Sequence, residues 1–341
     1  YSPFSQFGMQ DAWDFFEKRD LPLVTEARKR AFPECQSAPE VTKVMREYCT
    51  SNNVELKLKT RVDGFIIEDG KIAGLETNNG NFVGKSYILA TGGSSHAETG
   101  STGEGVTWLR ELGHSVWAPN PNIVPLVADQ KWVTDLSGTT LSFMKITFTD
   151  QHDAKKVRFS RTGKILFTHF GVSGPLILNA AHDVKQLLRN GKVYAYIDMY
   201  PDTEVGTLRN RVLELFNINK NKTLKNVLKE VAPHGMAEAV AAVLPEGVAE
   251  KKVHSVSKDE RNYVADIMKN MPFTISGTMG MDWAVISDGG VELKEVDTKT
   301  MASRLHPNLF FTGDVLHINR PSGGYSLQLC WTTGYVAGMS V

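Results

Sequence analysis

Two short apolar segments of this chain end in the dipeptide Thr-Gly, one at Thr91-Gly92 and the other at Thr312-Gly313. Glycine at the carboxyl end of a strand lets the backbone approach a ligand closely. In open α/β sheets, ligands lie beyond the carboxyl ends of the strands. A single ending of this kind is most simply a tight turn, but two of them favour a shared ligand site.

Two features near the C terminus could complete such a site. Asp314 directly follows the second Thr-Gly, and its carboxylate could accept hydrogen bonds from sugar-like hydroxyls. The alternative is an ordinary turn or helix-capping aspartate. Gly323-Gly324 precede an expected helix over 325–339, whose first N–H groups and positive dipole end attract negative charge. The alternative there is an ordinary glycine-rich helix entry.

Other reactive side chains give weaker signals. A histidine titrates near neutral pH and can act as an acid or base, but a lone histidine is more often structural. The candidates of this kind are His169, His306 and His317. The acidic residues show no metal-ligand spacing such as HExxH, so no metal site is expected. Three cysteines without CxxC spacing argue against disulfides and zinc, and indicate a reducing compartment.

Bulk properties restrict the class of protein. A chain of 341 residues exceeds the usual size of a single core, so two or three domains are expected. Lys plus Arg and Asp plus Glu both equal 38, so net charge gives no pull toward nucleic acid or anionic lipid. No apolar stretch is long enough to span a membrane, and no signal peptide opens the chain. We therefore expect a cytoplasmic protein.

Hydrophobic periodicity divides the chain into regions of different character. Helical periodicity at 10–19 and 38–52 is followed by strict alternation at 54–58. Strands are then predicted at 62–68 and 71–77, with the hairpin signal Asp69-Gly70 between them. A continuous apolar strand at 87–90 suggests a sheet buried on both faces. Residues 120–201 are β-rich, 202–270 are helical, and strand signals return after 271.

Six segments together resemble the BaiN/YhiN-like flavoproteins, which are usually described as NAD(P)/FAD-dependent oxidoreductases. The segments are 87–93 (YILATGG), 99–105 (TGSTGEG), 166–175 (LFTHFGVSGP), 288–301 (DGGVELKEVDTKTM), 309–314 (LFFTGD) and 323–328 (GGYSLQ). Their order and spacing fit over essentially the whole chain.

This resemblance implies an α/β fold in which a β-barrel interrupts a Rossmann-like FAD-binding domain and itself carries a small helical insert. The implied FAD-binding domain covers 1–119 and 304–341. The barrel domain covers 120–201 and 271–303, and the helical insert covers 202–270.

The resemblance also implies the cofactor site. Thr91, Gly92 and Gly93 would lie near the adenylate or pyrophosphate part of FAD, and Gly313 and Asp314 near the ribitol and pyrophosphate. The isoalloxazine would lie by Gly323, Gly324, Tyr325 and Ser326, where a helix start suits the negative charge of a reduced flavin. NAD(P)H is the implied electron donor, and a small unsaturated or carbonyl-containing molecule is the implied substrate. No catalytic acid or base is identified, although Tyr325 and His317 are candidates from their place in the motif.

In one respect the chain departs from the family pattern. Members begin with a strand, a GxGxxG turn and an acidic residue that grips the adenosine ribose, and no GxGxxG lies near Tyr1. We interpret the chain as truncated within the family's first domain. Two alternatives to the oxidoreductase stay open: a catalytically inactive, flavoprotein-derived scaffold or binding module, and an FAD-dependent RNA-modifying enzyme suggested by fold analogy. The zero net charge argues against the RNA-modifying enzyme, so no nucleic-acid partner is expected. The oligomeric state is not predicted.

Overall fold

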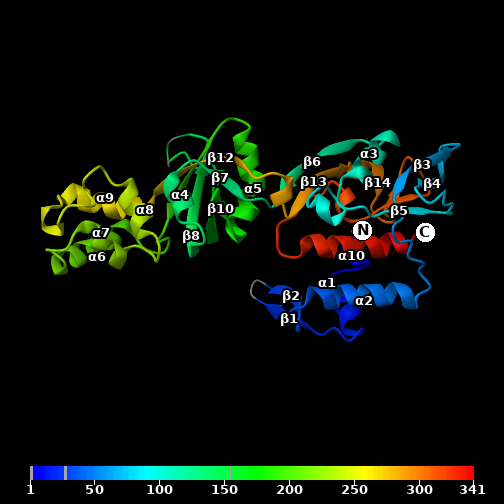
Figure 1. Ribbon diagram of the computed structural model, residues 1–341, viewed down its shortest axis with the longest axis horizontal. Helices are drawn as coiled ribbons and strands as arrows, with labels where there is room; N and C mark the ends of the chain where they lie inside the picture. The colour runs from blue at the N-terminus through cyan, green and yellow to red at the C-terminus, as the bar shows by residue number, and fades with distance from the viewer. Residues whose placement is uncertain (1–2, 27–28, 152, 154) are drawn as a thin grey trace. The chain divides into compact units, whose positions relative to one another are not determined.

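The computed structural model describes residues 3–26, 29–151, 153 and 155–341, and its contacts divide the chain into two compact units (Figure 1). The first unit combines Tyr1–Asn120 with Ile286–Val341. The second unit is the continuous segment Pro121–Val285. The chain therefore leaves the first unit once and returns to it, so the second unit is an insertion in the first.

A four-stranded sheet lies at the centre of the first unit, in the order β14-β15-β16-β5. Its strands are β14 (Val296–Asp297), β15 (Ala302–Ser303), β16 (Leu309–Phe311) and β5 (Tyr87–Leu89). β5 and β16 run parallel, with Phe310 opposite Ile88. The two apolar strands that end in Thr-Gly are therefore neighbours in one sheet, as the Rossmann-like fold requires.

Two helices cover this sheet, which lies between them in Figure 1: α3 (Glu104–Glu111) and α10 (Tyr325–Gly338). Leu109 of α3 and Val336 of α10 are completely buried in one core with Phe311 of β16. Full burial of such a side chain contributes about 1.5–3 kcal/mol relative to its exposure. This packing fixes the starts of both helices relative to the strand ends.

A hairpin of β3 (Val62–Glu68) and β4 (Lys71–Thr77) confirms the Asp69-Gly70 turn, where both residues adopt positive φ. The alternating segment 54–58 is not a strand, and Leu58 is 80% exposed there. Alternation produces a strand only where a neighbouring strand supplies hydrogen bonds and packing, and this segment has none among the described residues.

The remaining elements of the first unit are short. Near the N terminus, α1 (Met9–Glu17) and α2 (Ala38–Ser51) flank the hairpin of β1 (Leu23–Glu26) and β2 (Arg30–Pro33). Phe16 of α1 packs edge-on against Trp331 of α10 at 5.1 Å, and so joins this part to the sheet's covering helix. β13 (Ile286–Val291) pairs with β6 (Val116–Asn122) in a separate two-stranded sheet.

The second unit is built on a closed six-stranded barrel in the order β10-β7-β12-β11-β8-β9. Alternating side chains, such as Ile146 and Phe148 of β8, are completely buried inside it. The barrel strands are β7 (Leu126–Ala128), β8 (Thr140–Thr149), β9 (Phe159–Thr168), β10 (Gly171–Ser173), β11 (Val193–Asp198) and β12 (Met271–Thr278), and its helices are α4 (Lys131–Asp135) and α5 (Pro175–Leu188). The β-barrel that the family resemblance implies is confirmed.

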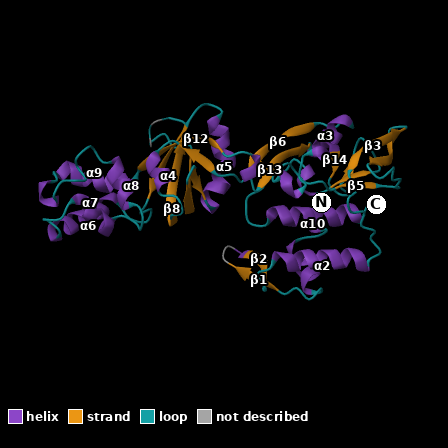
Figure 2. Cartoon of the chain, in the orientation of Figure 1, coloured by secondary structure: helices purple, strands orange, loops and turns teal. Residues whose placement is uncertain are grey.

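Four helices follow β11, and Figure 2 shows them as an all-helical group. They are α6 (Val205–Ile218), α7 (Leu224–Val231), α8 (Ala237–Val243) and α9 (Lys258–Lys269). Leu208, Val212 and Phe216 of α6 form the buried stripe that helical spacing predicts. These helices share one core with the barrel, which explains why they belong to the same compact unit.

We expected the barrel domain to extend to residue 303, but residues 286–303 belong to the first unit. Only β12 returns to the barrel, whereas β13 pairs with β6, and β15 pairs with β16 in the first unit. Short strands with little periodicity do not indicate which of two sheets they join, because only the hydrogen-bonding partner decides this.

Candidate functional site

The carboxyl ends of β5 and β16 bring the two predicted glycine turns together. Because the strands are parallel, Thr91–Gly93 and Gly313-Asp314 emerge from the same edge of the sheet. A Cβ atom placed on Gly93 would lie 3.7 Å from the Cβ of Asp314, so the turns are in direct proximity. Gly92 and Gly313 both have positive φ, 76° and 63°, which a side chain would strain.

The turn after β5 packs so closely that two of its contacts leave no room for a side chain. A Cβ on Gly93 would lie 2.2 Å from the Oγ of Ser287 in β13. A Cβ on Gly105, at the start of α3, would lie 2.1 Å from the Oγ1 of Thr91. The Ser94 N–H donates to the Ser287 Oγ at 2.8 Å. The hydroxyl groups of Ser287 and Thr91 therefore fill the space beside these two glycines.

The Asp314 carboxylate forms a salt bridge with Arg320, and only 18% and 5% of the two side chains are exposed. Burial raises the pKa of the Asp314 carboxyl, and the Arg320 guanidinium only partly offsets this effect. The carboxylate is therefore largely shielded from water, with the Arg320 guanidinium beside it. Donors from a ligand, such as hydroxyl groups, would stabilise it there.

Arg320 joins the strand end to the start of α10, which begins after Gly323 and Gly324, both with positive φ. Its Nε donates to the Oγ of Ser326 at 2.8 Å. The predicted residues Asp314 and Ser326 thus belong to one polar cluster through an arginine that sequence reasoning missed. The neighbouring Tyr325 is 57% exposed.

Two buried polar atoms around these turns make no hydrogen bond, Ser94 Oγ and His317 Nδ1, beside the buried Asp314–Arg320 salt bridge. A buried polar atom without a partner costs about 1–3 kcal/mol, so such atoms seldom cluster without a function. Together they offer both donors and acceptors. A dinucleotide carrying hydroxyls, phosphates and a heterocyclic edge has complementary groups, so these residues fit FAD.

The three histidines considered as acids or bases lie in different surroundings. His317 stacks on Trp117 with ring centroids 5.1 Å apart, close to the glycine turns. The His306 ring lies 2.9 Å from the Leu112 carbonyl oxygen and 3.1 Å from that of Gly70. His169 belongs to the second unit, where it packs edge-on against Phe170. Only His317 is near the candidate site.

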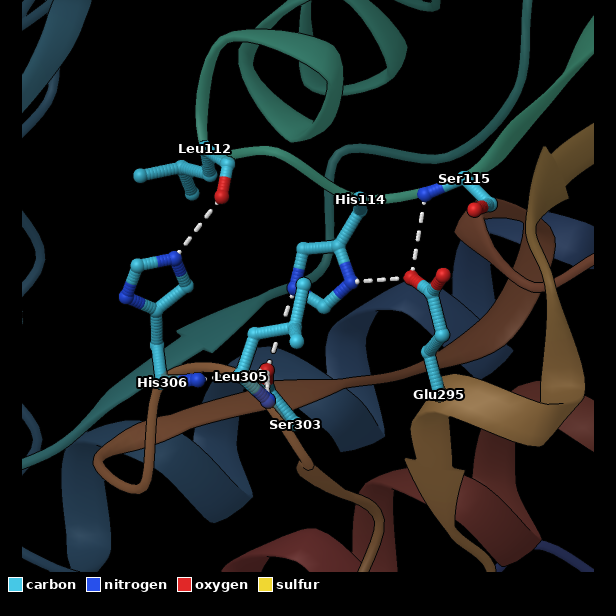
Figure 3. Close-up of polar contacts among 7 residues, drawn as sticks. All are labelled: Leu112, His114, Ser115, Glu295, Ser303, Leu305 and His306. Atoms are coloured by element: carbon cyan, nitrogen blue, oxygen red, sulfur yellow. Dashed lines mark hydrogen bonds and ion pairs between the residues drawn. The ribbon is translucent and has the colours of Figure 1, made fainter.

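A second polar cluster, drawn in Figure 3, has the order of groups found in serine hydrolases. The Ser303 Oγ lies 3.0 Å from His114 Nε2, and His114 Nδ1 lies 2.8 Å from a Glu295 carboxylate oxygen. The Ser303 Oγ also accepts hydrogen bonds from the backbone N–H groups of Leu305 and His306. These two donors occupy the lone pairs of a buried oxygen, so Ser303 donates to His114 and is not placed to act as a nucleophile.

The charges of this cluster follow from its burial. Burial lowers the pKa of His114 by more than the Glu295 carboxylate raises it, so the ring is neutral at pH 7. Burial acts to raise the pKa of Glu295, but hydrogen bonds from Ser115 and His114 outweigh it, and the net direction is downward. A neutral ring that donates from Nδ1 and accepts at Nε2 satisfies both neighbours. We interpret the cluster as a structural connection between β15 and the segment after α3.

Within the described residues, no three His, Cys, Asp or Glu side chains are grouped so that they could bind a metal ion. In the same part of the chain, no helix is both long and apolar enough to cross a membrane.

Comparison with known proteins identifies the family. A family model described as "HI0933-like protein Rossmann domain" matches residues 1–340. The chain belongs to this family. It is a family of flavoprotein oxidoreductases, so the resemblance seen in the glycine motifs is confirmed, as is the Rossmann-like fold class.

Two curated relatives cover most of the chain. A "Ribosomal RNA dihydrouridine synthase" from Haemophilus influenzae is 27% identical, covering 90% of this chain and 73% of the relative. A "3-dehydro-bile acid delta(4,6)-reductase" from Clostridium scindens is 26% identical, covering 98% of this chain and 80% of the relative. Among solved structures, Mycobacterium smegmatis Sdh1 in complex with UQ1 matches at 16% identity and a TM-score of 0.44. That match covers 99% of this chain but only 54% of the solved chain.

Sequence reasoning missed three residues of the candidate site. Ser94 and Ser287 meet only because β13 lies beside the turn after β5. Arg320 had a local signal, since it is the one basic residue between the Thr-Gly-Asp strand end and the Gly-Gly helix start.

Proposed function

We propose that this protein is an FAD-dependent oxidoreductase that passes hydride from NAD(P)H through the flavin to an unsaturated substrate. The observation that carries this proposal is the meeting of the two glycine turns after β5 and β16 beside the buried Asp314–Arg320 salt bridge. Two buried polar atoms without a partner, Ser94 Oγ and His317 Nδ1, lie at the same place. Such a place suits a polar ligand, and the family supplies its class.

The chain's own residues would divide the binding of FAD as follows. Thr91, Gly92 and Gly93 would offer backbone groups to the cofactor, and Gly313 would do so at the neighbouring strand end. The side chains of Ser287 and Cys330 fill the space beside Gly93 and Gly313. Asp314 would accept hydrogen bonds from hydroxyl groups of the cofactor. The start of α10, at Gly324 and Tyr325, offers N–H groups and a positive dipole end. The bound flavin would supply the hydride chemistry, while the protein orients it and excludes water.

The two curated relatives point to one reaction class with different substrates. The name of the Clostridium scindens relative denotes a reductase of a bile acid, and that of the Haemophilus influenzae relative denotes an enzyme that makes dihydrouridine. Both names describe the addition of hydrogen to a carbon–carbon double bond. We therefore propose reduction of a double bond conjugated to a carbonyl group, with a small molecule as the substrate.

A second candidate substrate is RNA, which the name of the Haemophilus influenzae relative and one surface feature favour. In the second unit, segment 220–225 pairs with 249–254 through hydrogen bonds such as Leu224 N to Lys251 O at 2.8 Å. The apolar members of these segments, Leu224 and Val253, are buried, whereas Lys220, Lys225 and Lys252 are exposed. These three lysines could contact phosphates.

Cofactor uptake tests the first proposal. We expect the purified protein, together with any residues that its gene encodes before Tyr1, to show flavin absorption after incubation with FAD and to be bleached anaerobically by NADH or NADPH. Asp314→Ala should weaken FAD binding at least tenfold, whereas Asp297→Ala, on the short strand β14, should not. A protein that stays colourless would instead support the non-catalytic scaffold.

Salt-dependent binding tests the RNA candidate. If RNA is the substrate, log K for a structured RNA should fall linearly with log salt, and the triple variant K220E/K225E/K252E should reduce the slope by about 3. The control K43E/K57E/K131E makes the same charge change elsewhere and should leave the slope almost unchanged. Equal effects of both triple variants would show only non-specific attraction, and would leave the small-molecule proposal as the better one.

A further inference from the structure

Arg320 is a buried cation at the start of α10, and 5% of its side chain is exposed. Its Nε donates to Ser326 Oγ, and its Nη1 donates to the carbonyl oxygen of Ile318. Its Nη2 forms the salt bridge to Asp314. A guanidinium has five N–H donors in a fixed planar arrangement, so these contacts leave part of its donor capacity unused.

Two positive features therefore coincide at the same place. The first turn of α10 carries the partial positive charge of a helix N terminus, and Ser326 in that turn is bonded to the guanidinium. The Asp314 carboxylate is the salt-bridge partner of Arg320, and it is the group that the proposed function assigns to the cofactor's hydroxyls. An additional anionic group at this position would be stabilised by both the helix and the arginine.

We propose that Arg320 compensates the negative charge that a reduced flavin carries on its pyrimidine edge, and so raises the reduction potential of bound FAD. This inference rests on the proposed function, because it requires FAD with its isoalloxazine at the start of α10. Hydride transfer to the oxidised flavin places a negative charge on the pyrimidine ring, and a buried guanidinium stabilises that charged form over the neutral one. The low dielectric around a buried side chain strengthens the effect.

The other anion of FAD, its pyrophosphate, leads to a different expectation. Pyrophosphate carries the same charge in both oxidation states of FAD. An arginine bound to it would therefore strengthen the binding of oxidised and reduced FAD equally and leave the reduction potential unchanged. Only an arginine at the pyrimidine edge would distinguish reduced from oxidised FAD. The ratio of the two affinities is therefore the diagnostic quantity.

The test measures that ratio in Arg320→Gln and Arg320→Lys. We expect Arg320→Gln to weaken the binding of reduced FAD by about tenfold relative to the binding of oxidised FAD. For a two-electron couple, this change lowers the midpoint potential by about 30 mV. Arg320→Lys keeps the charge and should recover most of the potential. The double variant D314N/R320Q leaves no unpaired buried carboxylate, so it provides the measurement if the single variant folds poorly.

A matched control is Lys269→Gln, which removes one partner of the half-buried Lys269–Asp198 ion pair in the second unit. It should leave the potential unchanged. If Arg320→Gln weakens the binding of oxidised and reduced FAD equally, the inference is overturned in favour of a pyrophosphate contact. If neither the affinities nor the potential change, it is overturned in favour of a purely structural salt bridge. If the wild-type protein takes up no FAD, the proposed function itself fails and the inference fails with it.

Discussion

At the residue scale, burial decides what each polar group of this protein can do. His114 and Ser303 have the atoms of a catalytic pair, yet both are buried and every lone pair and hydrogen is used internally. Asp314 and Arg320 are also largely buried, but they form a salt bridge at the ends of two glycine turns, and the contacts of Arg320 use only part of its five N–H donors. We therefore interpret the first pair as structural, whereas the second pair lies among the residues that we propose to bind FAD.

The stability contributed by His114 should depend on pH. Because the folded-state pKa of His114 lies below its ordinary value of 6.5, the unfolded chain binds this proton first as pH falls. The contribution is fully present above about pH 6.5 and is lost as the pH falls toward the folded-state pKa. Glu295, whose pKa is lowered from 4.5, stays ionised in both states across this window.

We therefore expect His114→Gln to cost about 1–3 kcal/mol of unfolding free energy at pH 7.5 and clearly less at pH 5.5. Urea denaturation at the two pH values measures this difference. His96→Gln is the control, since His96 pairs with Glu98 at an exposed site and should show a small cost at both pH values. A cost for His114→Gln that does not change with pH would contradict the assignment of a neutral buried ring.

At the element scale, the turn after β5 is positioned by the elements that touch it. β13 supplies Ser287, and the start of α3 supplies Gly105. β13 and α3 are far apart in the sequence, so the contacts around this turn form only when the first unit has folded. Its glycines serve two purposes, because Gly92 requires positive φ whereas Gly93 requires space.

Gly93→Ala should weaken FAD binding about tenfold or more while the fold is retained. The added methyl group would displace the Ser287 Oγ and break its hydrogen bond from the Ser94 N–H, which shifts the backbone of the turn. Gly64→Ala is a matched control in β3, where a Cβ meets no atom within 4 Å. Titration of each variant with FAD, beside its circular dichroism spectrum, measures both effects. Equal affinity in the two variants would show that the turn does not contact the cofactor.

At the scale of the whole molecule, the second unit is a continuous insertion whose ends lie together. The backbone N–H of Val285 donates to the carbonyl oxygen of Ile123 at 3.1 Å. The barrel is closed, and one hydrophobic core runs through the barrel and the helices α6–α9. A segment with its own core and adjacent ends has the properties of an independent domain.

Residues 121–285 produced alone should therefore fold and unfold cooperatively, but should take up no FAD, since every residue assigned to the cofactor lies in the first unit. Thermal unfolding followed by circular dichroism, with flavin absorption as a second measurement, tests both statements. A broad, non-cooperative transition would show that the second unit depends on the first for its stability.

The sequence by itself determined the parts of this protein that depend on local pattern. Two apolar strands ending in Thr-Gly, the Gly-Gly start of α10 and the stripe of Leu208, Val212 and Phe216 follow from glycine geometry and hydrophobic period, and all are present. The family was also readable, because its motifs are long and ordered. The other domain boundaries and the assignment of site residues to FAD stay predictions.

Only the tertiary structure decided which distant residues meet. Ser94 and Ser287, and likewise His114, Glu295 and Ser303, are brought into hydrogen-bond distance by strand pairing across long stretches of sequence. The pairing of β13 with β6, and not with the barrel, was decided in the same way. A local pattern fixes the conformation and the buried face of a segment, but its partners depend on the packing of the complete chain. For that reason the glycine turns could be predicted, whereas the role of Arg320 could not.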